Sequence, residues 1–169
     1  MAPIVLFGIQ FTLSLAAYAL IARWYVAPRL SRLSPVLALV PLLWVHAFRV
    51  VGGTILAPGS VGPGVPTAFR EMIGYGDMIT ALLAMVALLA LRAQLPRALA
   101  FVWICVTVGM IDTVNAIIQS MRYGVFTYPL GVNWVIVTIY VPALLVSSYL
   151  IFVNLLRPDR SAVAGLGHA

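Results

Sequence analysis

Residues 132–156 read VNWVIVTIYVPALLVSSYLIFVNLL, a stretch without a single charged side chain. An α-helix needs about 20 predominantly apolar residues to cross the hydrocarbon core of a bilayer, because each residue advances it by about 1.5 Å. The stretch meets this length. It therefore predicts a transmembrane helix near the C-terminal end of the chain.

The rest of the chain has the same character. Apolar residues make up 63% of its 169 positions and charged residues 8%, against roughly 45–50% and about 25% in soluble domains. We therefore predict an all-α, polytopic membrane protein that forms a single bundle over residues 1–156, followed by a short cytoplasmic tail at 157–169. The five transmembrane helices are predicted at about 3–25, 35–56, 69–91, 97–120 and 132–156.

Proline, serine and glycine mark several boundaries. Ser34 directly before Pro35 is typical of a helix start, with an N-cap hydroxyl followed by proline at the first helical position. Pro41 and Pro142 lie inside predicted helices, where each removes a backbone hydrogen bond and is expected to bend the helix. The uncharged, Gly- and Pro-rich connection 57–68 predicts an irregular loop over the mouth of the bundle.

The arginines predict the orientation in the membrane. Seven lie beside the first and third connections and in the tail: Arg23, Arg29, Arg32, Arg92, Arg97, Arg157 and Arg160. Only Arg49, Arg70 and Arg122 lie toward the other side. Because basic residues accumulate on cytoplasmic loops, we expect the N-terminus outside and the C-terminus in the cytoplasm. The expected location is the cytoplasmic (inner) membrane of a bacterium.

The composition excludes several chemistries. The chain has no lysine, which excludes a retinal or pyridoxal Schiff base. Its single cysteine, Cys105, excludes internal disulfides and cysteine relays. The net charge of +6 comes from arginines beside short loops, so it indicates membrane orientation and not nucleic-acid binding. No cofactor is expected.

Polar residues within the predicted helices gather at one depth. Ionisable residues inside a membrane are costly and usually face the bundle interior or a cavity. Counted from the helix ends at 1.5 Å per residue, Asp77 and Asp112 lie roughly 12 Å below the outer edge. Gln10 lies at the same level, Tyr140 slightly deeper and His46 somewhat shallower. The inner half of the bundle is nearly all aliphatic. The predicted ligand- or ion-binding residues are Asp77, Asp112, His46, Arg49, Gln10, Asn115, Gln119 and Tyr140.

This pattern favours a small integral membrane binding or transport protein with a polar pocket in the outer half of the bundle. Asp77 and Asp112 would respond to protons or ions, and Arg49 would supply a counter-charge. His46 would be a titrating neighbour. The connection 57–68 would act as a lid over the pocket.

A purely structural interpretation stays open at the level of the sequence. The polar side chains could tie helices together. In that case Arg49 could pair with Asp77. Arg70 could then pair with Glu71 or Asp112.

Three further interpretations concern other classes of protein. The chain could be an accessory subunit of a larger membrane complex, or form a homo-oligomer. It could also be a membrane-embedded enzyme that acts on a lipid or quinone, with His46 and an aspartate as acid and base. Haem at His46 would need a second axial ligand, and the other histidine, His168, lies in the tail. A divalent metal on His46 and the two aspartates lacks any supporting local spacing.

Overall fold

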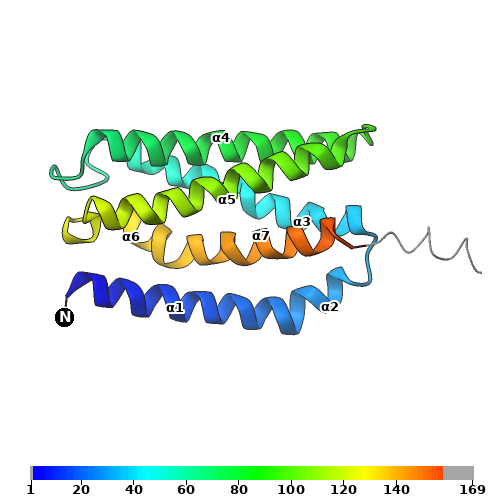
Figure 1. Ribbon diagram of the computed structural model, residues 1–169, viewed down its shortest axis with the longest axis horizontal. Helices are drawn as coiled ribbons and strands as arrows, with labels where there is room; N and C mark the ends of the chain where they lie inside the picture. Colours follow the sequence, from blue (N-terminus) through cyan, green and yellow to red (C-terminus); the bar gives the residue numbers. More distant parts are fainter. Residues whose placement is uncertain (1, 158–169) are drawn as a thin grey trace, which may run out of the picture.

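The computed structural model of the chain describes residues 2–157 (Figure 1). Most of the predicted tail, including Arg160 and His168, lies outside these residues. Within residues 2–157 the chain is entirely helical and has no strand. Five helical segments are long and apolar enough to cross a membrane: Pro3–Leu30, Pro35–Leu56, Thr67–Arg92, Ala98–Arg122 and Val132–Leu155. The predicted number of long apolar helices is confirmed, and the first continues five residues beyond its predicted end.

Three of these segments change helix type along their length. In chain order the elements are α1 (Pro3–Ile21), the π-helical turn η1 (Ala22–Val26), α2 (Ala27–Leu30), α3 (Pro35–Ala47), the 3-10 helix η2 (Phe48–Leu56), α4 (Thr67–Arg92), α5 (Ala98–Arg122), the 3-10 turn η3 (Val125–Thr127), α6 (Val132–Val135), the π-helical turn η4 (Ile136–Tyr140) and α7 (Val141–Leu155).

Two prolines follow closely on π-helical turns. Pro28 comes just after η1 and Pro142 just after η4. A proline ring crowds the carbonyl four residues earlier and offers it no N–H. A π turn, with its wider spacing between bonded residues, accommodates this conflict without ending the helix. Pro41, by contrast, lies within α3, which remains α-helical to Ala47.

The helices form one layered bundle (Figure 1). Helices α4 and α5 pack against each other, α3 and η2 pack on α4, and α7 lies between α3 and α1. The connections 57–66 and 123–131 lie together at one end, which we call the loop end (left in Figure 1). The opposite end, with connections 31–34 and 93–97, is called the arginine end.

Large apolar side chains cover the outside of the bundle. Leu13, Leu82 and Tyr149 are each 65% exposed, and they lie on three different helices. An extended apolar exterior of this kind marks a surface that a membrane or a partner covers.

The interior is apolar at both ends. The half near the arginine end is filled by aliphatic side chains such as Leu39, Val102 and Ile151. At the loop end a smaller cluster includes Phe7 and Phe69. The charged side chains of the interior lie between these two clusters.

The connection 57–66 is hydrogen-bonded both to the connection 123–131 and to the start of α6. The Gly62 N–H donates to the Pro129 carbonyl at 2.7 Å, and Asn133 Nδ2 donates to the Ser60 carbonyl at 3.1 Å. Val65 is buried in the apolar cluster beneath. The connection expected to act as a lid therefore lies over the end of the bundle, held by backbone and side-chain bonds.

Candidate functional site

Arg49 lies between two aspartates in the interior of the bundle. Its Nε donates to Asp77 Oδ1, its Nη2 donates to Asp112 Oδ2, and its Nη1 donates to the Gly109 carbonyl at 2.9 Å. The arginine side chain is 3% exposed, and the aspartates are 14% and 16% exposed. Both aspartates thus face the interior, on neighbouring helices, and share one guanidinium. We call Arg49, Asp77 and Asp112 the charge cluster.

The 3-10 helix η2 brings Arg49 to the level of the aspartates. A 3-10 helix rises about 2.0 Å per residue and an α-helix about 1.5 Å. Arg49 is seven residues from the end of η2, which corresponds to about 14 Å. Asp77 and Asp112 are each ten residues from the loop-end terminus of α4 and α5, or about 15 Å. An α-helix would have left Arg49 only about 10 Å deep.

The same lengthening corrects the expected depth of His46. This residue is three positions before Arg49 and lies in α3, on the side of Arg49 away from the loop end. It therefore lies about one turn deeper than Arg49 and about 4 Å deeper than the aspartates, and not shallower than them as the sequence analysis expects.

Glycines leave the space that the charged side chains occupy. A Cβ added to Gly52 of η2 would overlap the Asp77 carboxylate, and one added to Gly76 of α4 would overlap the Asp112 carboxylate. A Cβ on Gly109 of α5 would lie 3.3 Å from Nη1 of the arginine. Each member of the cluster thus packs against backbone that carries no side chain.

The charges of the cluster do not balance when all three groups are ionised. Two carboxylates and one guanidinium leave one negative charge in excess. Each carboxylate uses one oxygen for the arginine and turns the other toward a glycine, Gly52 or Gly76. Buried charge is costly unless it is compensated, and Arg49 can balance only one of the two carboxylates.

His46 lies next to the charge cluster, on the side toward the middle of the bundle. The ring is fully buried, and its Nε2 lies 3.5 Å from Ser148 Oγ. Its Nδ1 has no hydrogen-bond partner among the described residues. A Cβ added to Gly109 would lie 3.8 Å from this nitrogen and 3.3 Å from Nη1 of Arg49. The imidazole and the guanidinium therefore face the same small space.

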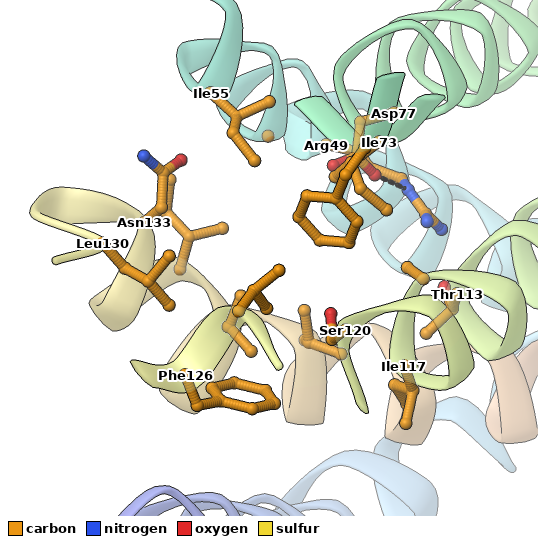
Figure 2. A pocket seen from close by; sticks show the side chains of 17 residues that line it. Arg49, Ile55, Ile73, Asp77, Thr113, Ile117, Ser120, Phe126, Leu130 and Asn133 are labelled. Atoms are coloured by element: carbon orange, nitrogen blue, oxygen red, sulfur yellow. Dashed lines mark hydrogen bonds and ion pairs between the residues drawn. The ribbon is translucent and has the colours of Figure 1, made fainter. Parts of the chain in front are cut away.

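A cavity extends from the charge cluster toward the loop end. Its volume is about 70 Å³, enough for a few water-sized molecules. Figure 2 shows Arg49 and Asp77 together at one side of this cavity, with Phe126 and Leu130 across from them. Polar groups are few on its walls. Besides the charged pair, the polar side chains that line it are Thr113, Ser120 and Asn133.

Other residues in the predicted set form contacts away from the charge cluster. Gln10 is exposed and accepts a hydrogen bond from Trp134 Nε1 at 2.6 Å. Asn115 donates to Met72 Sδ at 3.3 Å. The side-chain oxygen of Gln119 is buried without a hydrogen-bond partner in the part of the chain that the structure describes. None of these three lines the cavity.

Tyr140 and Arg70 also form their hydrogen bonds outside the charge cluster. The Tyr140 hydroxyl donates to the Val45 carbonyl at 2.5 Å, so this tyrosine fixes the backbone one residue before His46. Arg70 donates to Thr67 Oγ1 at 3.2 Å. The suggested pairing of Arg70 with Asp112 is wrong, because Asp112 pairs with the guanidinium from η2.

Some residues of the site do not stand out in the sequence. Gly52 and Gly109 matter because they leave room for ionic side chains on other helices, and Ser120 lines the cavity. Such roles depend on which helices pack together, so no local signal reveals them. His46 and the two aspartates do not form a three-ligand metal group within residues 2–157.

A family model matches residues 6–156, a range that contains the charge cluster and the cavity. The chain belongs to this family, which is described as a domain of unknown function (DUF8737). No curated protein matches the chain, and no solved structure does.

Proposed function

We propose that this chain is a small integral membrane binding or transport protein whose charge cluster responds to a proton or a monovalent cation. In this proposal the five apolar segments span the cytoplasmic membrane of a bacterium. The arginine end faces the cytoplasm, because basic residues favour that side. The loop end and the cavity then face outward.

The observation that carries the proposal is the unequal number of charges in the cluster. One guanidinium is shared by two carboxylates, all three largely buried. A structural ion pair needs one carboxylate for one arginine. The second carboxylate leaves a buried negative charge, and intramembrane carboxylates with that property are candidates for proton or ion binding.

The surroundings of the cluster suggest a route on one side only. The cavity connects Arg49 and Asp77 with the loop end. On the opposite side the interior is filled by the aliphatic cluster of α3, α4, α5 and α7. A proton or small cation would thus enter from the outer side, while passage inward would require the helices to rearrange.

In this proposal the hydrogen bonds that hold the connection 57–66 control access to the cavity. The bonds from Gly62 to Pro129 and from Asn133 to Ser60 hold the loop end closed. Opening these bonds would widen the access to the cavity. In this proposal the connection 57–66 is a gate, with Asn133 as the side chain that closes it.

Thermal unfolding of the purified protein tests the proposal. The midpoint should be measured in detergent micelles over a range of pH, and in sodium, potassium or choline chloride at equal ionic strength. A ligand that binds only the folded state at 100 times its Kd stabilises by about 2.7 kcal/mol. We expect the unfolding midpoint to depend on pH or on one of the two small cations, sodium or potassium. Choline should not change it.

Two variants separate the charge cluster from general charge effects. Asp112→Asn should remove the dependence, since it removes the excess negative charge. Glu71→Gln should keep it, because Glu71 is exposed and outside the cluster. A wild-type protein that is insensitive to both pH and small cations would refute the proposal and leave the cluster a structural tie.

A further inference from the structure

A groove runs between the first and fifth helical segments in the half of the bundle near the arginine end. Its volume is about 520 Å³. On the first segment the groove is hollowed by Ala19, Ala22 and Ala27, and α7 contributes Val146 and Tyr149. Figure 1 shows α1 and α7 side by side along this length. The groove is almost wholly apolar, and its one charged side chain is that of Arg23.

The dimensions of the groove match one leaflet of a bilayer. On the first segment it extends from Leu15 to Ala27, a rise of about 18 Å. The segment spans Pro3–Leu30, so Leu15 lies near its midpoint and Ala27 near its arginine end. Half of a hydrocarbon core of about 30 Å is about 15 Å. The groove therefore has the length of one acyl chain in a single leaflet.

The charge at this end favours an anionic occupant. Within residues 2–157, the half of the bundle near the arginine end has no carboxylate. The carboxylates described by the structure all lie in the other half: Glu71, Asp77 and Asp112. The arginines described at the arginine end are Arg23, Arg29, Arg32, Arg92, Arg97 and Arg157.

Arg23 is placed to reach a lipid phosphate. Its side chain is exposed and forms no hydrogen bond within the described residues, whereas the Arg29 side chain donates to the Tyr25 carbonyl. Its Cα is about 10 Å from the midpoint of the segment. A long arginine side chain can extend from that depth to the headgroup region. The exposed Trp24 and Tyr25 beside it are of the kind found at membrane interfaces.

We propose that the groove binds one acyl chain of an anionic phospholipid from the leaflet at the arginine end, with the lipid phosphate on Arg23. The inference rests on the membrane location proposed above but is independent of the charge cluster. The small alanine side chains leave space for the acyl chain, and the excess of arginines selects a headgroup with net negative charge.

Native mass spectrometry of the full chain, released from micelles with defined lipids, tests the inference. The probes are phosphatidylglycerol and phosphatidylcholine with identical acyl chains. We expect one phosphatidylglycerol to remain bound per chain under conditions that remove phosphatidylcholine. Arg23→Gln should weaken retention roughly fivefold, as expected for one basic residue near an anionic surface. Ala19→Leu should abolish it by filling the groove.

Two matched controls make the test specific. Arg29→Gln removes the same charge at the same end but outside the groove lining, and Ala16→Leu adds the same bulk on an exposed position of α1 outside the groove. Both should retain the lipid. If Ala19→Leu does not fold, the comparison of Arg23→Gln with Arg29→Gln still decides.

Three results would overturn the inference. These are equal retention of the two lipids, equal weakening by Arg23→Gln and Arg29→Gln, or a lipid-free dimer in which a second copy fills the groove. Asp112→Asn should leave lipid retention unchanged. Failure of the charge-cluster proposal is therefore distinguishable from failure of this one.

Discussion

Neutralising the members of the charge cluster should change stability according to the charge that remains, and not according to the number of substitutions. Arg49→Gln leaves two carboxylates, 14% and 16% exposed, without a counter-charge. Removal of one partner from a buried ion pair costs about 3–5 kcal/mol. Asp112→Asn instead leaves Arg49 balanced by Asp77. Asparagine keeps the shape and an acceptor oxygen, so we expect a loss of only about 1 kcal/mol.

The combined variants sharpen the expectation. Asp77→Asn with Asp112→Asn leaves the buried guanidinium unpaired, and the loss should return to about 3–5 kcal/mol. Adding Arg49→Gln to that pair makes every group neutral and should recover most of the loss. The three positions are in direct contact, so their effects should be strongly non-additive.

Reversible unfolding in mixed detergent micelles, followed by circular dichroism, measures these free energies. Glu71→Gln is the control. A substitution at an exposed position outside the charge cluster usually changes the free energy of unfolding by less than about 0.5 kcal/mol. Two results together would contradict an excess charge in the cluster: Asp112→Asn alone costs as much as Arg49→Gln, and adding Arg49→Gln to Asp112→Asn restores full stability. That pattern is expected of a balanced structural ion pair.

Two other predictions test the packing and the orientation. Gly52→Ala should cost about 1–3 kcal/mol in unfolding free energy because the new methyl group displaces the Asp77 carboxylate; Gly53→Ala meets only a flexible methionine side chain at 3.2 Å and should cost less. In a background without the native cysteine, a membrane-impermeant thiol reagent added outside whole cells should label a cysteine at Gly62 but not one at Ala93, and the reverse labelling would contradict the proposed orientation.

The helical architecture is predictable because its signals are local. Length and apolar composition alone locate all five segments. The start of α3 is predicted from two neighbouring residues, and the structure confirms it: Ser34 Oγ accepts a hydrogen bond from the Leu37 N–H at 3.3 Å.

The departures from α-helical geometry are harder to predict. Pro28 and Pro142 create the conflict that π turns accommodate, but a bend would accommodate it too. The long 3-10 helix after Ala47 has no comparable sequence signal beyond the adjacent Gly52 and Gly53. This departure sets the depth of Arg49 and His46, so a count that assumes α-helical rise places both too close to the loop end.

The composition of the site is only partly predictable for a related reason. The rarity of ionisable residues within the apolar segments identifies the cluster members and His46. Asn115 lies three residues after Asp112, which predicts a shared binding site, yet its side chain contacts Met72 on α4. Spacing along one helix shows that two side chains lie near each other on its surface. It does not show that both reach the same neighbouring groups.

The construction of the charge cluster favours a functional role over a purely structural one. Well-packed apolar residues stabilise a protein interior as well as a buried ion pair does, and often better. This chain departs from such packing in three ways at one place. It has an additional carboxylate, glycines that carry no side chain, and a 3-10 helix that places Arg49 deeper in the bundle than an α-helix would. Interhelical attachment alone requires none of these, since Tyr140 and Ser147 already bond α3 through single hydroxyls. In our proposal the unbalanced charge is compensated when a proton or a monovalent cation binds, and the stability of the variants in each ionic condition measures that compensation.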